Sequence, residues 1–206
     1  MLLAIDTSAG TSVAVVDRDA GVLAEESSAD TRSHAELVGT LIAAVLERSG
    51  IAPARLSGVA VGMGPGPFTG LRVGIAAGRA FAAGIGRPTV PLVSHDAVAF
   101  GESGPLVVVT DARRREYAWS AYGEPDELGL PVRLAGPALV PRDGIDEVLA
   151  ARPGARRLDA PVVSAGSLGL LAEALYAHGR PLAADEPVYL RPPDVTLSDG
   201  PKRVTA

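Results

Sequence analysis

The sequence predicts a two-lobed α/β protein, and this expectation rests on its composition, its pattern of elements and an internal repeat. Of the 206 residues, 47% are hydrophobic and 21% are charged, which is typical of a folded chain rather than a disordered one. A chain of this length buries about 70% of the surface that it exposes when unfolded, so we expect a substantial core. Strand and helix signals alternate, and the second half begins with the same signals as the first.

The first half has the signals of three strands, a helix, a strand, a second helix and a last strand. The first three strands are joined by short turns, which predicts an antiparallel meander. The first helix carries a wide apolar stripe and ends at Gly50. A loop rich in proline and glycine at 62–67 precedes the second helix. We place the strands at 2–6, 13–16, 22–28, 56–61 and 89–93, and the helices at 34–49 and 68–84.

The second half resembles the first. The run 106–111 matches 2–6: each is apolar, ends in aspartate, and precedes a polar turn and another strand, here 117–122. This suggests duplication of one βββαβα unit; chance similarity between two buried strands is the alternative. We expect helices at 145–151 and 168–178 with a strand at 161–164 between them. The chain then divides into a first lobe (1–103), a reduced second lobe (104–190) and an extended or disordered tail (191–206).

A duplicated βββαβα unit with aspartate after each first strand is typical of the actin-like ATPase (RNase H-like) fold, in which two hairpin turns hold the phosphates of ATP. Such turns need glycine where backbone approaches phosphate. Asp6, Thr7 and Ser8 form a possible vestigial nucleotide loop, but the turn after Asp111 has no glycine and carries Arg113–Arg115. We therefore interpret Asp6 first as a turn-capping carboxylate. An actin-fold ATPase or small-molecule kinase acting alone is the alternative function.

Residues that carry catalysis or hold metals are scarce. The chain has no cysteine, no His-Glu-x-x-His run and no Gly-x-Ser-x-Gly run. No two of His34, His95 and His178 are spaced as metal ligands on one helix. We expect no metal site, no cofactor and no catalytic set, which also disfavours a peptidase. His34 is interpreted as a solvent-facing or capping residue of the first helix.

The net charge of −5 argues against this chain alone binding a nucleic-acid backbone. Arg113–Arg115 is the basic cluster best placed to meet tRNA or an acidic partner, and a solvated turn is the other interpretation. The N-terminus reaches Asp6 after only four apolar residues, which is too short for a signal peptide. No apolar run approaches membrane length. We expect a cytoplasmic protein with no membrane contact.

The second helix carries glycines at every fourth position, Gly70, Gly74 and Gly78. Glycine inside a helix costs about 0.5–1 kcal/mol relative to alanine, so this glycine ridge needs a compensating reason. Close approach of another backbone is the usual reason. The neighbour is either a partner helix or a part of this chain, its own sheet or its first helix. We expect a partner to use the ridge.

The run Gly64–Gly74, Gly-Pro-Gly-Pro-Phe-Thr-Gly-Leu-Arg-Val-Gly, resembles the signature of the TsaB (YeaZ) family, whose usual form has serine at the position of Pro67. Three other segments agree with that family: 3–8, 111–117 and 187–191. The resemblance covers nearly the whole chain and implies a two-lobed actin-like fold with a reduced second lobe. It also implies a role in making threonylcarbamoyladenosine in tRNA.

The resemblance implies a non-catalytic subunit that binds and activates a TsaD-like transferase. A TsaE-like ATPase joins the assembled complex, tRNA is reached only through that complex, and a homodimer through the same helices stays open. The metal-holding histidine pair of the TsaD relatives has only His34 as a counterpart here, with Val38 in place of its partner. The family pairs through the two helices of the first lobe. The expected partner-interface residues are His34, Leu37, Leu41, Phe68, Gly70, Leu71, Gly74 and Gly78.

Overall fold

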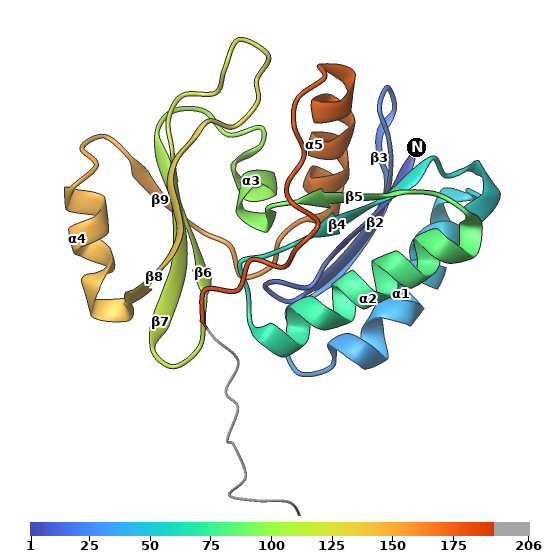
Figure 1. Ribbon diagram of the computed structural model, residues 1–206, viewed down its shortest axis with the longest axis horizontal. Helices are drawn as coiled ribbons and strands as arrows, with labels where there is room; N and C mark the ends of the chain where they lie inside the picture. Colours follow the sequence, from blue (N-terminus) through green and yellow to red (C-terminus); the bar gives the residue numbers. More distant parts are fainter. Residues whose placement is uncertain (192–206) are drawn as a thin grey trace, which may run out of the picture.

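The computed structural model describes residues 1–191, in which two β-sheets lie side by side with helices around and between them (Figure 1). The first sheet has the strand order β3-β2-β1-β4-β5. The predicted tail falls, apart from Arg191, outside the described residues. The strands of this sheet are β1 (Leu2–Asp6), β2 (Thr11–Asp17), β3 (Gly21–Ser28), β4 (Gly58–Gly62) and β5 (Thr89–Leu92).

Helices cover both faces of the first sheet. α1 (His34–Ser49) and α2 (Phe68–Ile85) lie on one face, and α5 (Ala165–Ala177) lies on the other (Figure 1). Successive side chains of a strand point to opposite faces, so β1 sends Leu3 and Ile5 under α1 and α2 but Leu2 and Ala4 under α5. Left-handed glycines, Gly50 and Gly86, end α1 and α2.

The second sheet repeats this arrangement with one strand fewer. Its order is β8-β7-β6-β9, which matches the β3-β2-β1-β4 part of the first sheet. In both sheets the first strand is antiparallel to the second and parallel to the fourth. This confirms the duplicated actin-like fold with a reduced second lobe. The elements are β6 (Leu106–Asp111), β7 (Glu116–Tyr122), β8 (Arg133–Pro141) and β9 (Arg156–Asp159), with α4 (Ile145–Ala150) on the outer face.

Three elements of the structure differ from the prediction, namely two strands of the second half and one short helix before residue 104. The strand expected at 161–164 is a loop that leads into α5, and β9 lies earlier, in a run that begins with two arginines and therefore lacks a strand-like apolar pattern. β8 was not predicted because Gly136 and Pro137 interrupt its sequence. The short helix α3 (Ser94–Ala99) was also missed. Among the helices of the described residues, none combines the length and apolarity needed to span a membrane.

The boundary predicted at residue 104 describes the order of the chain but not its packing. α5 follows the second sheet in sequence, yet Leu168 and Leu171 pack into the core of the first sheet. Residues 183–189 also return to the first lobe, where the Val188 N–H donates to Met63 O at 2.7 Å. The second lobe is therefore smaller in space than the range 104–190.

Candidate functional site

The loop between β4 and α2, which carries the family-like sequence, is held in place by hydrogen bonds and close packing within the chain. The Gly64 N–H donates to Ser94 Oγ at 3.0 Å, and the Ser94 N–H donates back to Gly64 O at 2.8 Å. A Cβ atom at Gly62 would lie 1.9 Å from Asp6 Oδ2, and one at Gly66 would lie 2.6 Å from Ser8 O. These two glycines are required because the end of β1 presses against the loop.

The glycine ridge of α2 faces its own sheet, so the expectation that it faces a partner is wrong. Thr7 Oγ1 donates to Gly70 O at 2.8 Å and accepts the Gly74 N–H at 3.1 Å. A Cβ atom at Gly74 would lie 2.2 Å from Thr7 Oγ1, and one at Gly78 would lie 2.6 Å from Val61. Leu71 is fully buried beside the ridge. These residues position α2 and are not accessible to a partner.

His34 is buried rather than solvent-facing, so that part of the interpretation is also wrong. Its Nδ1 lies 2.7 Å from Thr11 Oγ1, and a Cβ atom at Gly70 would lie 2.9 Å from its Nε2. Burial, with a smaller contribution from the Arg113 charge, lowers the pKa of His34 and favours the neutral ring. Val38, one turn further along α1, lies in the core. His34 therefore packs α1 against the neighbouring elements, and Val38 offers no ligand atom beside it.

Asp6 caps its turn, as the sequence predicts. Its Oδ1 accepts from the Ser8 N–H at 2.8 Å and from Ser8 Oγ at 2.5 Å, whereas the buried Oδ2 has no hydrogen-bond partner. Burial raises the pKa of Asp6, and the bonds from Ser8 only partly oppose it. Asp6, Thr7 and Ser8 are all buried and bonded within the chain. Phosphate binding by this loop would have to disrupt those bonds.

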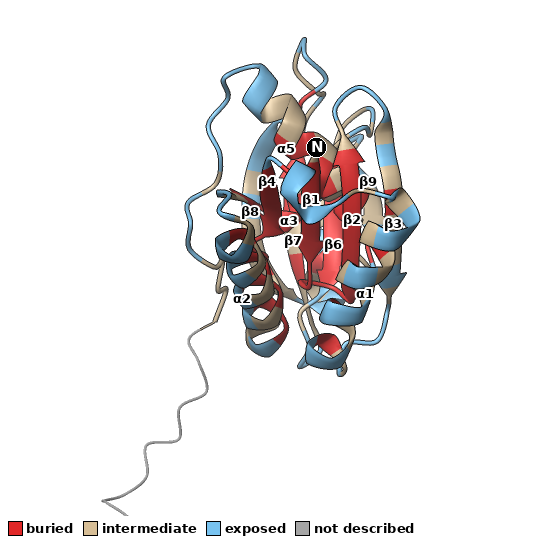
Figure 2. Cartoon of the chain, turned by 90° about the vertical axis from the view of Figure 1, so that its right-hand side faces the viewer, coloured by how far each residue is buried: buried red, intermediate tan, exposed pale blue. Residues whose placement is uncertain are grey.

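The outer face of α1 and α2 carries small side chains. Figure 2 shows these two helices with exposed surfaces directed away from the buried strands. Apart from its chain neighbours and the backbone of its own helix, Gly39 in α1 has no atom within 4 Å of the position that a Cβ would take. Leu37, Leu41 and Phe68, from the predicted interface, are half-buried. The small exposed residues on this outer helix face are Ala35, Gly39 and Ala43 of α1, and Ala76, Ala80 and Ala83 of α2.

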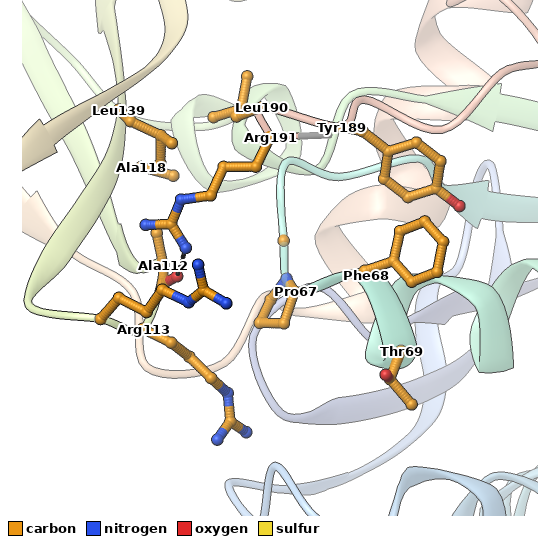
Figure 3. A pocket seen from close by; sticks show the side chains of 12 residues that line it. Pro67, Phe68, Thr69, Ala112, Arg113, Ala118, Leu139, Tyr189, Leu190 and Arg191 are labelled. Carbon is orange, nitrogen blue, oxygen red and sulfur yellow. Dashed lines mark hydrogen bonds between the residues drawn. The ribbon is translucent and has the colours of Figure 1, made fainter. Parts of the chain in front are cut away.

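A cavity separates the start of α2 from the turn between β6 and β7 (Figure 3). Pro67, Phe68 and Thr69 line one side, and the turn with Arg113 lines the other. The segment 189–191 closes it, and its Tyr189 ring lies 4.8 Å from the ring of Phe68. The described residues contain no group of three or more His, Asp and Glu side chains that could hold a metal ion.

Comparison with known sequences identifies relatives among the threonylcarbamoyltransferases and among the TsaB proteins. A family model described as TsaD, tRNA N6-adenosine threonylcarbamoyltransferase, matches residues 9–139. An uncharacterized Mycobacterium tuberculosis protein is 40% identical over 140 residues, which are 67% of this chain and 64% of that protein. The chain thus spans less than two thirds of that relative's length. The Haemophilus influenzae tRNA threonylcarbamoyladenosine biosynthesis protein TsaB is 32% identical over 125 residues, 58% of this chain and 52% of that protein.

The similarity to solved structures extends over more of the chain than the similarity to these sequences does. A Pseudomonas aeruginosa protein described as similar to the peptidase YeaZ superposes with a TM-score of 0.75 and 25% identity, and the match covers 92% of this chain and 99% of that one. The two sheets of matching topology define an actin-like α/β protein, and the family model relates it to the threonylcarbamoyltransferases. Within that class, the chain belongs to the TsaB (YeaZ) family.

The sequence contains the small residues of the outer helix face but does not identify that face as exposed. Ala76 and Ala80 were visible in the sequence as small residues of the second helix, and Gly39 and Ala43 have the same four-residue spacing in the first. Spacing shows that residues share a stripe, but it does not show which stripe faces the sheet. The more conspicuous stripe, the glycine ridge, is the buried one.

Proposed function

We propose that this protein is a non-catalytic subunit of the cytoplasmic machinery that forms threonylcarbamoyladenosine in tRNA, and that it binds and activates a TsaD-like transferase. The observation that carries the proposal is the exposed small-residue face of α1 and α2 in a chain of the TsaB family. Small side chains allow two helix pairs to approach closely and to pack over a large area.

The similarity to the transferases themselves supports pairing. A Streptococcus pyogenes tRNA N6-adenosine threonylcarbamoyltransferase is 41% identical over 93 residues, which are 44% of this chain and 26% of that protein. Related chains carry related helix pairs, so the two proteins can meet across a pseudo-twofold axis with α1 and α2 of each in contact. The same geometry allows two copies of this chain to form a homodimer when the transferase is absent.

A supporting rather than catalytic role agrees with the hydrogen bonds and the sequence of the two turns that would form a nucleotide site. The hydroxyls of Thr7 and Ser8 are committed to bonds with α2 and Asp6, and the turn at Arg113 has no glycine. In this proposal the transferase carries out the chemistry, a TsaE-like ATPase joins the assembled pair, and tRNA is reached through the complex.

The substitution Gly39→Leu tests the pairing surface. Because Gly39 lies in a helix and faces open space, leucine should stabilise the free protein by up to about 1 kcal/mol. On the outer helix face the same side chain should hold a partner helix away, and overpacking of a close contact costs about 1–3 kcal/mol per site. We expect an unchanged or higher melting temperature and loss of co-purification with the TsaD-like protein of the same organism.

Ala177→Leu is the matched control, because Ala177 is exposed at the end of α5, on the opposite face of the sheet. This variant should pair as the wild type does. A folded Gly39→Leu protein that pairs normally would show that α1 does not form the interface. Threonylcarbamoyl transfer by the isolated chain would contradict the supporting role.

A further inference from the structure

A second cavity, of about 460 Å³, lies on the side of the first sheet that α5 covers. Three parts of the chain form it: the end of β5 with the start of α3, the connection between β7 and β8, and the carboxyl end of α5 with the residues after it. Figure 1 shows α3 and α5 side by side between the two sheets. α1 and α2 cover the opposite face, so this cavity is separate from the proposed pairing surface.

The walls of this second cavity are largely aliphatic. Leu92, Leu130 and Leu171 are almost fully buried behind it. Val132 and Leu182 also line it, but they are 39% and 40% exposed. Binding sites for small molecules are typically concave, mostly apolar and of this size. An apolar group placed here would remove the exposed surface of these two side chains from water, which favours binding.

One pair of charged residues in the cavity holds its wall together. Asp126 Oδ1 accepts the N–H groups of Leu128 and Leu130, both at 2.9 Å, and these bonds fold the connection between β7 and β8. Arg180 Nη2 donates to Asp126 Oδ2 at 2.9 Å, which ties that connection to the segment after α5. Both oxygens of Asp126 are therefore engaged, and the wall is formed before a ligand arrives, which lowers the entropy cost of binding.

The other pair of charged residues, Asp96 and Arg133, is less tightly joined. Arg133 Nε lies 3.7 Å from Asp96 Oδ1, which is beyond hydrogen-bonding distance. Within residues 1–191 the Arg133 guanidinium donates no hydrogen bond, and Asp96 accepts one side-chain hydrogen bond, from Tyr122 Oη to Oδ1 at 2.7 Å. The guanidinium donors and Asp96 Oδ2 are therefore available to a ligand in the cavity.

The surroundings of Asp96 favour an added positive charge. Its side chain is 24% exposed, and burial raises its pKa, although the Arg133 charge and the hydrogen bond from Tyr122 oppose the rise. An ammonium group beside this carboxylate would replace hydration that the carboxylate has lost. Arg133 offers the complementary contact, because a guanidinium can bind a carboxylate through two parallel hydrogen bonds.

We propose that this cavity binds a zwitterionic small molecule, an α-amino acid with an apolar side chain, whose ammonium group meets Asp96 and whose carboxylate meets Arg133. The two charged groups of an α-amino acid share one carbon atom, so they can reach two protein groups that lie this close together. A ligand with a single charge would satisfy only one member of the pair. The apolar side chain of the ligand would lie against the leucines of the wall.

The experiment is calorimetric titration of the purified full-length chain, without the transferase, so its outcome does not depend on pairing. The probes are L-leucine and two analogues that each lack one charge, isoamylamine without the carboxylate and isocaproate without the ammonium group. We expect saturable leucine binding, and binding of each analogue about tenfold weaker or more, since a charged hydrogen-bonded contact is lost. L-serine should also bind more weakly than leucine, because it leaves the aliphatic walls uncovered.

Two substitutions test the two contacts separately. Arg133→Gln should weaken leucine binding about tenfold or more, but it should not weaken the binding of isoamylamine, which has no carboxylate to lose. Asp96→Asn keeps an acceptor for the Tyr122 hydroxyl, so we expect the fold to be retained. This variant should weaken leucine binding to a similar extent and should not weaken the binding of isocaproate.

Arg142→Gln is the matched control. Arg142 directly follows β8, which Arg133 begins, and its ion pair with Asp111 lies outside the cavity. This variant should bind leucine as the wild type does. Absence of leucine binding by the folded protein, analogues or serine that bind as tightly as leucine, or equal weakening in Arg142→Gln would overturn the proposal. An Arg133→Gln protein with a lower melting temperature and undiminished leucine binding would also overturn it, because the pair would then serve only to hold α3 against β8.

Discussion

Asp6 and Thr7 stand side by side at the end of β1 and perform different structural tasks. Thr7 bonds to the backbone of α2, and Asp6 closes the turn to β2 through Ser8. In an actin-like fold this position suggests phosphate or metal chemistry. Here the hydroxyl and carboxylate oxygens that such chemistry would use are largely occupied by the chain itself, and the remaining oxygen, Asp6 Oδ2, is buried without a partner.

The raised pKa of Asp6 predicts a pH-dependent stability. The folded chain holds the Asp6 proton to a higher pH than the unfolded chain does, so the favourable contribution is complete below the unfolded pKa and is lost as pH rises through the folded pKa. Asp6→Asn, neutral at every pH, should therefore be more stable than the wild type at pH 7, and this advantage should shrink as the pH falls toward 4. Urea unfolding at the two pH values measures the difference.

Asp17→Asn serves as the control of opposite sign. Asp17 is exposed, and its carboxylate accepts the N–H groups of Ala20 and Asp19, which lower its pKa. Its contribution is present above the unfolded pKa and is lost in acid, so this variant should be less stable than the wild type at pH 7. A destabilised Asp6→Asn protein at pH 7 would mean that the buried carboxylate is ionised and needed as such.

At the scale of elements, α2 lies close to its sheet because the glycines that face the sheet have no side chain. Gly74→Ala should destabilise the protein because the new Cβ would meet Thr7 Oγ1 at 2.2 Å and would break two hydrogen bonds. We expect a net loss of about 1–3 kcal/mol, typical of overpacking in a well-packed core. Thermal unfolding measures it, and Thr7→Ala in the same chain should recover part of the loss because it removes the clashing oxygen.

Gly84→Ala, in the last turn of the same helix, provides the comparison. A Cβ atom there meets nothing within 4 Å, so the substitution should stabilise the protein by about 0.5–1 kcal/mol through helix propensity. If both glycine substitutions stabilise the protein, the helix moves away from the sheet freely, and the ridge has no packing role.

The elements of the first lobe could be predicted from sequence, because short turns and two kinds of periodicity define them locally. β1 to β5, α1 and α2 lie where the pattern places them, within a few residues. β8 and β9 could not be predicted, since Gly136 and Pro137 interrupt one and arginines begin the other; only pairing with β7 and β6 makes them strands.

The candidate site was less predictable than the fold. Glycine spacing identified a helix with a close neighbour, but the neighbour is Thr7, more than sixty residues away in the chain. Likewise, Arg113 and Pro67 face one cavity only because the two lobes meet there. Contacts of this range depend on the tertiary arrangement, which no local pattern encodes.

At the scale of the molecule, two helices each follow one sheet in the chain and pack against the other sheet in space. α3 follows the first sheet and packs against α5 and the second sheet, where His95 lies 2.8 Å from Ser120 Oγ and 3.0 Å from Thr110 Oγ1. Burial lowers the pKa of His95 to about 3, so a neutral ring bridges these hydroxyls. α5 follows the second sheet but packs on the first. Each lobe therefore completes its core with a segment that continues from the other.

This exchange predicts that the lobes unfold together. Leu168 in α5 is fully buried against the first sheet, and Leu168→Ala should cost about 2–5 kcal/mol. The single tryptophan, Trp119, lies in β7 of the second sheet, so its fluorescence reports on the lobe that the substitution does not touch. Urea unfolding of Leu168→Ala should shift the fluorescence midpoint as far as the midpoint from circular dichroism, because a two-state chain has one transition for every probe. Ile145→Ala, in the core of the second sheet, is the reciprocal variant and should lower the same shared transition. An unmoved fluorescence midpoint in Leu168→Ala, with a second transition in circular dichroism, would show that the lobes are independent units and that α5 couples them only weakly.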